Sequence, residues 1–259
     1  MNDQTNRRKR QHIEVIGRDE GVERNGRFFD AIQLQHRAMP EINLNDVDPS
    51  IEVMGKRLSF PLLISSMTGG DDVLVAKVNQ HLAEAAQITG VAMGVGSQRV
   101  MLEDTGAQAS FDLRRYAPDA LLFANMGAIQ LNNGMGSAQL QQAIDVLSAD
   151  AIFLHLNPLQ EAVQPEGDTN FANLAQAIGH AQSQLNVPVV LKEVGVGLSV
   201  ADIELGLRHG IRWFDVAGRG GTSWARIEQQ RREDSHTLGF TLQDWGIPTP
   251  LAMKNARPY

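Results

Sequence analysis

The 259-residue sequence contains no cysteine, few aromatic residues (5%) and no excess of positive charge. Without cysteine it can form no disulfide, no Cys-ligated metal site and no thiol nucleophile. The formal net charge of −7 argues against a general nucleic-acid or membrane-surface binder, because such binding needs a basic face. The first residues lack the apolar core of a secretory signal, and no apolar run approaches the roughly 18 residues of a spanning helix. We therefore expect a cytoplasmic protein that binds neither nucleic acid nor membrane.

One short segment departs from the acidic average. Residues 7–10 read Arg-Arg-Lys-Arg, a cationic run close to the start of the sequence. Such a run most simply predicts a solvated, mobile tail.

Short apolar runs alternate from residue 61 onward with stretches that carry apolar residues at helical spacing. The runs cover 61–66, 91–96, 121–125, 151–155, 187–192 and 211–216, and the helical spacing is clearest over 75–86, 140–147 and 171–185. The runs are continuously apolar, as expected for strands buried on both faces of a parallel sheet. The alternation predicts six βα units of an α/β fold. Before them, Gly55 and Lys56 separate two short segments that predict a hairpin covering the sheet.

The distribution of polar residues separates the two architectures that fit these units. A doubly wound sheet gathers its ligand residues at one switch point, whereas a barrel draws them from the carboxyl ends of nearly all strands. Here polar residues follow every run, which favours a (β/α)₈ TIM barrel. We predict a single domain, with a basic arm and capping hairpin over residues 1–60 and an incomplete barrel over 61–259, its last two units missing.

Three of these strand ends indicate an anion site. Lys192 ends a buried run, so it must either pair with a carboxylate or face a ligand. Gly220, Gly221 and Thr222 bring main-chain N–H groups and a hydroxyl to a helix start, although a tight turn with a Thr N-cap explains them nearly as well. Arg99 follows another run and suits bidentate binding of phosphate or carboxylate, with a solvated surface position as the alternative. Together the cations favour a diphosphate as ligand.

The segment 155–161, HLNPLQE, is the densest polar stretch. Glu161, with Glu166 and Asp168 nearby, offers oxygen ligands of the kind that Mg²⁺ shares with a substrate phosphate. A solvated acidic loop, in which Asn157 and Pro158 start a turn, explains the same residues equally well. Glu193, beside Lys192, is expected to be a structural salt-bridge partner.

These motifs together resemble the type 2 isopentenyl-diphosphate isomerases, which are FMN-dependent TIM barrels. The resemblance runs from residue 8 to about residue 249. It rests on RKRQH (8–12), SSMTGG (65–70), VGSQR (95–99), ANMGA (124–128), HLNPLQE (155–161), LKEVG (191–195), GGTSWARIE (220–228) and WGIPT (245–249). Any one motif is weak, but their order and spacing are specific. The resemblance implies isomerisation of isopentenyl to dimethylallyl diphosphate, with reduced FMN, Mg²⁺, NADPH as reductant and a homo-oligomeric assembly.

The resemblance also assigns residues. It implies that FMN is bound by Ser66, Met67, Thr68, Ser97, Asn125, Lys192 and Thr222. It implies that the diphosphate is bound by Arg8, Lys9, His12, Ser97, Gln98, Arg99 and Gln160, and Mg²⁺ by Glu161. The reacting carbons are then surrounded by His155, Asn157, Gln160 and Glu228, with the last two as a candidate proton relay. The basic run becomes a substrate clamp.

Two departures from the family pattern leave alternatives open. Ala217 stands where the family commonly has a serine, and the two FMN-phosphate segments expected after WGIPT have no counterpart. One alternative is a non-catalytic remnant, or a fragment that needs a complementary partner because its edge strands are open. Another is an FMN-barrel oxidoreductase of the hydroxy-acid-oxidase kind, although RKRQH and HLNPLQE disfavour it.

Overall fold

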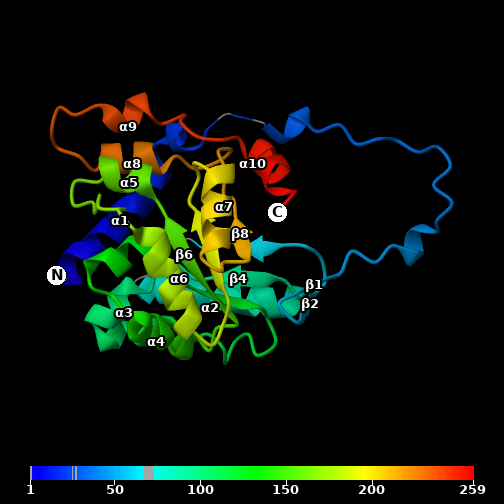
Figure 1. Ribbon diagram of the computed structural model, residues 1–259, viewed down its shortest axis with the longest axis horizontal. Coiled ribbons are helices and arrows are strands. Elements are labelled where there is room, and N and C mark those ends of the chain that lie inside the picture. Colours follow the sequence, from blue (N-terminus) through cyan, green and yellow to red (C-terminus); the bar gives the residue numbers. More distant parts are fainter. Residues whose placement is uncertain (1, 25, 27, 67–72) are drawn as a thin grey trace.

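The centre of the molecule is a six-stranded parallel sheet (Figure 1). The computed structural model describes residues 2–24, 26, 28–66 and 73–259. The strands lie across the sheet in chain order: β3 (Leu63–Ile64), β4 (Ala92–Gly94), β5 (Leu122–Gly127), β6 (Ala151–Leu156), β7 (Val189–Glu193) and β8 (Trp213–Asp215). A doubly wound sheet reverses its strand order, whereas a barrel adds each strand beside the previous one. The predicted barrel-type arrangement of βα units is therefore confirmed.

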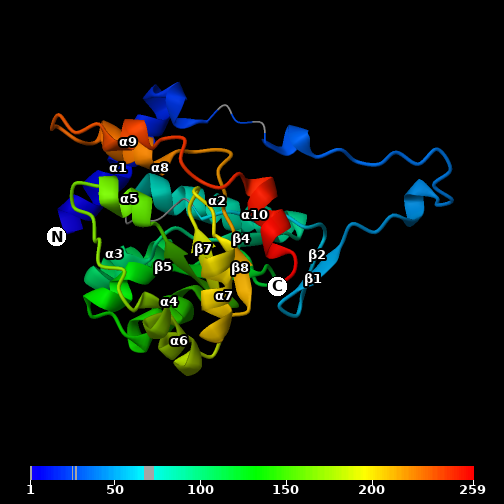
Figure 2. The ribbon, with the colours of Figure 1, turned by 45° about the horizontal axis from the view of Figure 1, so that its top comes forward.

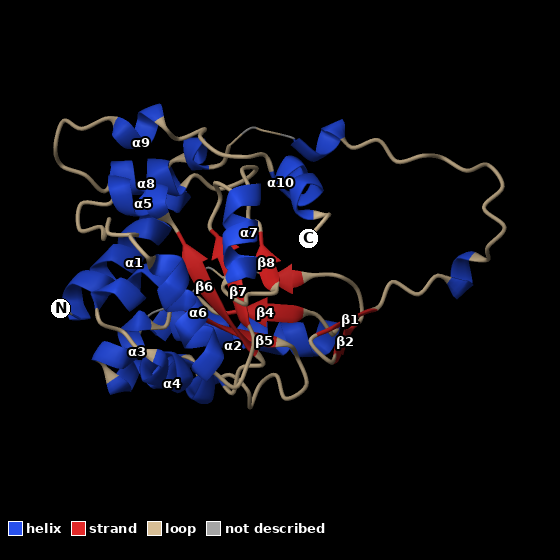
Figure 3. Ribbon diagram, viewed as in Figure 1, coloured by secondary structure: helices blue, strands red, loops and turns tan. Residues whose placement is uncertain are grey.

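Helices follow the strands and pack around the sheet (Figure 3). They are α2 (Val73–Thr89), α3 (Arg99–Glu103), α4 (Ser137–Leu147), α5 (Pro158–Val163), α6 (Leu174–Gln184), α7 (Val200–Arg208), α8 (Trp224–Gln230), α9 (Leu238–Thr241) and α10 (Thr249–Ala256). The apolar positions that predict α4 are all buried. Helix α6 is shorter than predicted, because Asn173 before it takes up a left-handed conformation with φ of 56°. Within the described residues, no helix combines the length and apolar character that membrane crossing requires.

Apolar side chains pack on both faces of the sheet. The larger cluster joins the strands to the helices, and the smaller one lies on the opposite face, where Phe123 and Phe153 stack with ring centroids 4.6 Å apart. The predicted hairpin forms from β1 (Ile51–Val53) and β2 (Lys56–Leu58), and Leu58 is buried in this smaller cluster. Burial on two faces explains why the strand sequences are apolar without alternation.

The start of the chain is a helix that packs on the body. Helix α1 (Asn2–Arg18) contacts α8 through a small apolar cluster that includes Val15 and Ile227. Just after α1, Asp19 accepts two hydrogen bonds from the guanidinium of Arg226, at 2.7 and 2.9 Å. The expectation of a mobile tail is therefore wrong, because these contacts hold the helix that carries the basic run.

The segment 29–49 forms an exposed arm that extends away from the body in both views (Figures 1 and 2). Its apolar side chains are unusually open: Leu34 is 90% exposed, Leu44 83% and Met39 78%. The arm leaves the body near α10 and returns at β1. Among the described residues, β3 and β8 each pair with one neighbouring strand, so both edges of the sheet are open.

Candidate functional site

The carboxyl ends of the strands surround a cavity of about 620 Å³. Its wall includes most of the residues that the sequence singled out: Arg8, Lys9, His12, Ser66, Ser97, Arg99, Asn125, His155, Asn157, Gln160, Glu161, Lys192 and Thr222. Met67 and Thr68 lie outside the described residues. Gln98 and Glu228 do not line the cavity. Residues from nearly every strand end therefore meet at one place, because parallel strands end at the same edge.

Cationic side chains reach this cavity from several elements. Arg8 and Lys9 come from α1, and the Lys9 Nζ donates to the main-chain oxygen of Ser97 at 3.3 Å. Arg99, on α3, lines the rim and pairs through its Nε with Glu103 Oε1 at 3.1 Å. Such a wall attracts a compact polyanion, since several cations converge on a partly enclosed space.

Lys192 occupies the floor of the cavity. Its Nζ lies 2.6 Å from Asp215 Oδ2 and 5.5 Å from the centroid of the Phe153 ring, and its side chain is only 7% exposed. The sequence left open whether this lysine meets a carboxylate or a ligand. In the structure it has the carboxylate partner and also lines the cavity. Asp215 was not predicted, although a carboxylate near the end of the apolar run 211–216 was a usable signal.

His155 is held in one tautomer by its neighbours. The Asn125 side-chain nitrogen donates to the main-chain oxygen of Val95 at 2.9 Å, so the Asn125 Oδ1 is an acceptor. His155 Nδ1 lies 2.8 Å from that oxygen and therefore carries the proton. This leaves Nε2 as the nitrogen available to a ligand. Burial, with additional effects from nearby cations such as Lys192, lowers the pKa of His155 to about 4, so the ring is neutral at pH 7.

We predict that His155 makes the protein acid-sensitive. Between the unfolded pKa of 6.5 and the folded pKa of about 4, the unfolded chain binds a proton at this ring that the folded chain does not. The free energy of unfolding is therefore unaffected by this ring above pH 6.5, and it falls as the pH is lowered from 6.5 toward 4. Urea unfolding at pH 7 and pH 5 should show a smaller loss of stability in His155→Gln than in the unmodified protein. Equal losses would contradict the assignment.

The start of α5 assembles a group of amides and carboxylates. Asn157 precedes the helix, and Pro158 at its first position favours the turn that brings Gln160 and Glu161 toward Asn157. The Asn157 Nδ2 donates to Gln160 Oε1 at 3.0 Å and to Glu161 Oε1 at 2.8 Å. Glu161 Oε2 accepts from the main-chain N–H of Asp168 at 2.8 Å. Burial raises the pKa of Glu161.

Glu228 connects this group to the N-terminal helix from behind the wall. Its Oε1 accepts from Gln160 Nε2 at 2.7 Å and lies 3.1 Å from His12 Nε2, while its Oε2 pairs with Arg231. Burial alone would raise the pKa of this fully buried carboxyl, but the hydrogen bond from His12 and the charge of Arg231 outweigh it and lower the pKa to about 2. Burial lowers the pKa of His12, so Arg231 is the permanent cation beside the carboxylate.

Several predicted roles differ from the geometry. Gln98 is fully buried and accepts from the main-chain N–H of Asn125 and donates to Ala143 O, so it supports the wall and has no surface for the predicted diphosphate contact. Glu193 is not the predicted salt-bridge partner, because its Oε2 accepts the four successive main-chain N–H groups of 194–197. Glu166, offered as a cation ligand, pairs with Arg231 at 2.6 Å.

Thr222 and two unpredicted residues complete the wall. The Thr222 hydroxyl donates to Glu23 Oε1 at 2.8 Å, which links the loop after β8 to the segment after α1. Trp224 lines the cavity with its ring edge-on to His12, 5.1 Å between centroids. Arg24 lines it as well. No signal in the sequence pointed to Arg24, because the carbonyls that its side chain contacts lie 171 to 221 positions away in the chain. Trp224 lies inside the motif 220–228, so that motif was a usable signal for it.

Relatives of known name share this sequence almost end to end. An isopentenyl-diphosphate delta-isomerase of Hydrogenovibrio crunogenus is 56% identical over 254 residues, which cover 97% of this chain and 74% of the relative. The enzyme of the same name from Paracoccus zeaxanthinifaciens is 54% identical, covering 97% of this chain and 72% of the relative. The chain belongs to the isopentenyl-diphosphate delta-isomerase family. The resemblance inferred from the sequence motifs is therefore confirmed.

Two further similarities bear on the cofactor and fold of this isopentenyl-diphosphate delta-isomerase family member. A family model described as FMN-dependent dehydrogenase matches residues 6–120 and supports FMN as cofactor. A soluble mutant of (S)-mandelate dehydrogenase from Pseudomonas putida superposes with a TM-score of 0.50 at 17% identity, covering 80% of this chain and 60% of that one. At this identity the likeness shows the fold alone, so it adds nothing to the oxidoreductase alternative.

Proposed function

We propose that this protein converts isopentenyl diphosphate to dimethylallyl diphosphate with reduced FMN and Mg²⁺. The observation that carries the proposal is one cavity in which cations face an amide–carboxylate network. Arg8, Lys9 and Arg99 lie on its wall, as does Gln160, whose amide is hydrogen-bonded to Glu228. The cations suit the diphosphate, and the network suits proton transfer at the hydrocarbon end.

The cavity fits FMN. Its volume of about 620 Å³ lies in the range of small-molecule and cofactor sites. The Ser66 hydroxyl is buried at this wall without a hydrogen-bond partner among the described residues, as expected of a group that awaits a ligand. Ser66, Ser97, Asn125, Lys192 and Thr222 are the described residues that would hold it. Reduced FMN, when bound, supplies an acid able to protonate an unactivated alkene.

The start of α5 fits Mg²⁺. Glu161 offers a carboxylate to the cavity, and the neighbouring Asn157 Oδ1 is buried without a partner among the described residues. Both are oxygen donors of the type that Mg²⁺ prefers, with the remaining positions filled by water and substrate phosphate.

The protein's own residues would then bind, orient and shield the substrate. The isomerisation adds a proton to one carbon and removes one from another, with no net redox change. Arg8, Lys9 and Arg99 hold the diphosphate, and the hydrocarbon end lies near Gln160. The Glu228 carboxylate fixes the direction of the Gln160 amide. A proton taken up at Gln160 Oε1 is balanced by transfer of an Nε2 proton to the ionised Glu228, so the amide passes through its imidic acid form and returns when the proton moves back. His12 and Trp224 close this side of the cavity against water.

The direct test supplies the purified protein with FMN, dithionite, Mg²⁺ and isopentenyl diphosphate, and follows dimethylallyl diphosphate. Flavin absorbance after gel filtration reports cofactor binding in the same sample. We expect both flavin retention and product. A protein that neither retains flavin nor forms product would overturn the proposal.

We predict that Glu161→Gln raises the Mg²⁺ concentration for half-maximal rate by about tenfold or more, because one anionic oxygen ligand is lost. FMN affinity should be unchanged, since Glu161 is not among the residues that would hold FMN. The Glu166→Gln variant is the matched control, because Glu166 is bound to Arg231 and does not line the cavity. An unchanged Mg²⁺ dependence of Glu161→Gln would exclude Glu161 as the ligand.

A second candidate function is that of a unit completed by a complementary polypeptide. The specific observation is the combination of two open sheet edges with the exposed apolar arm 29–49. A polypeptide homologous to the quarter of the Hydrogenovibrio relative that has no counterpart here should then bind, which gel filtration detects. Leu34→Asp should weaken this binding, whereas Ile88→Asp, at an equally exposed site on α2, should not. Full activity without such a polypeptide would exclude this candidate.

NADPH as reductant, a homo-oligomeric assembly and a cytoplasmic location stay predictions of the sequence. Each has a direct measurement: flavin reduction by NADPH under anaerobic conditions, mass by light scattering, and cell fractionation.

A further inference from the structure

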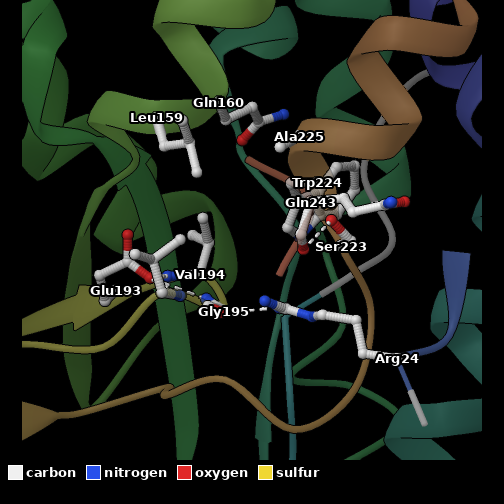
Figure 4. Close-up of a pocket in the computed structure, with 11 residues that line it drawn as sticks. Arg24, Leu159, Gln160, Glu193, Val194, Gly195, Ser223, Trp224, Ala225 and Gln243 are labelled. Carbon is white, nitrogen blue, oxygen red and sulfur yellow. Dashed lines mark hydrogen bonds between the residues drawn. The ribbon is translucent and has the colours of Figure 1, made fainter. Parts of the chain in front are cut away.

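Arg24 connects loops that belong to different strands. Its Nε donates to Gly221 O at 3.0 Å, and one terminal nitrogen donates to Gly195 O at 2.7 Å and Thr222 O at 2.8 Å. The other terminal nitrogen donates to Trp245 O at 3.3 Å. Figure 4 shows the guanidinium reaching from its own segment to Gly195. One side chain therefore holds the loops after β7 and β8 together.

The contact with Gly195 is restrained on both sides. The main-chain N–H of Gly195 donates to Glu193 Oε2 at 2.8 Å, while its carbonyl accepts from Arg24. Gly195 has a φ of 134°, which disfavours other residues, and a Cβ there would lie 3.1 Å from the Arg24 nitrogen. The close approach of the guanidinium thus depends on a glycine at this position.

The segment that carries Arg24 is also paired with the loop after β8. Glu23 forms an antiparallel bridge with Thr222, and the main-chain N–H of Arg24 donates to Gly221 O at 3.2 Å. This segment follows α1, the helix that brings Arg8 and Lys9 to the cavity. Arg24 therefore lies between the substrate-side helix and the cofactor-side loops.

We propose that Arg24 is a positioning residue that sets the distance between the diphosphate-binding helix and the FMN-binding loops. Four of its five N–H groups donate to main-chain carbonyls, so it acts through these loops and is not a ligand of diphosphate. Its positive charge strengthens every one of these hydrogen bonds. This inference rests on the proposed function, but its structural part can be measured in the protein without cofactor.

The test compares Arg24→Met with Arg114→Met. Arg114 is a matched control because its guanidinium likewise donates to several main-chain carbonyls, among them Ala120 and Ser148, but at the opposite, amino-terminal edge of the sheet. In Arg24→Met we expect the amides of 194–197 and 221–223 to exchange hydrogen about tenfold faster in the protein without FMN. The Kd for FMN and the KM for isopentenyl diphosphate should each rise about tenfold, with kcat at saturation nearly unchanged. Arg114→Met should lower the Tm without these changes.

Ethylguanidinium in solution should restore FMN affinity to Arg24→Ala, because it can replace the missing group in the space left behind. If Arg24→Met does not fold, Arg24→Lys, which retains the charge but not the fork of donors, takes its place with the same expectations. Unchanged exchange and unchanged KM, or equal effects of the Arg114 variant, would overturn the proposal. If the unmodified protein fails to bind FMN, the proposed function fails, while the exchange rates still decide the role of Arg24.

Discussion

Replacing Glu228 with glutamine is expected to lower kcat for isopentenyl diphosphate by about a thousandfold, within the range that general acid–base groups contribute. The substitution keeps the shape of the side chain but removes the ionised acceptor behind Gln160 and His12. The KM should change little, since Glu228 does not line the cavity. Product formation at saturating substrate, with reduced FMN and Mg²⁺ present, is the measurement.

The same variant should be less stable by about 3 kcal/mol, because removal of one partner from a buried ion pair leaves the other charge uncompensated. Arg231 is only 7% exposed, although Glu166 remains beside it. Glu166→Gln is the control: it removes a carboxylate from the same arginine but leaves Gln160 and His12 in place. A kcat for Glu228→Gln equal to that of Glu166→Gln would reject the catalytic assignment and leave only the structural one.

The second large effect is expected at Lys192. Lys192→Met should weaken FMN binding by about a hundredfold, because a nearly buried cation on the cavity floor is lost and Asp215 keeps its charge without a partner. Titration of the protein with FMN, followed by the change in flavin fluorescence, gives the Kd.

The double variant Lys192→Met/Asp215→Asn separates the two roles of this pair. It removes both charges, so stability to urea should largely return, whereas FMN affinity should remain low. Lys56→Met is the matched control, because Lys56 forms a similar ion pair with Asp150, at 3.0 Å, away from the cavity. Recovery of FMN affinity in the double variant would mean that Lys192 only neutralises Asp215.

Local pattern predicted those parts of the fold that depend on neighbouring residues. The apolar run before Asn125 and the spacing around Leu140 predicted a strand and a helix, because burial imposes a periodicity on each element. Element ends were less accurate, as at α6, where the left-handed Asn173 comes directly before the first helical residue, Leu174, and leaves Phe171 outside the helix. That conformation depends on the surrounding packing and leaves no clear mark in the sequence.

The sequence predicted which residues form the candidate site, but it did not predict the role of each residue. Gln98 and Gln160 carry the same amide and both follow strands, yet the first is fully buried behind the wall and the second lies on it. Whether a side chain lines the cavity or is buried behind its wall depends on how the helices and strands pack, and the spacing of residues in the sequence does not predict this packing. The basic run was likewise recognised as cationic, whereas its docking depends on Asp19 and Arg226, far apart in the chain.

The absences and the order of the βα units were thus properties of the sequence itself: no cysteine, no excess of positive charge, and polar residues gathered at the carboxyl ends of parallel strands. Only the tertiary structure determined which distant residues form hydrogen bonds with each other. Glu228 meets His12 across 216 positions, and Arg24 meets Gly195 across 171. Such pairs acquire their strength from burial, which weakens competition from water, and burial exists only once the distant segments have packed together.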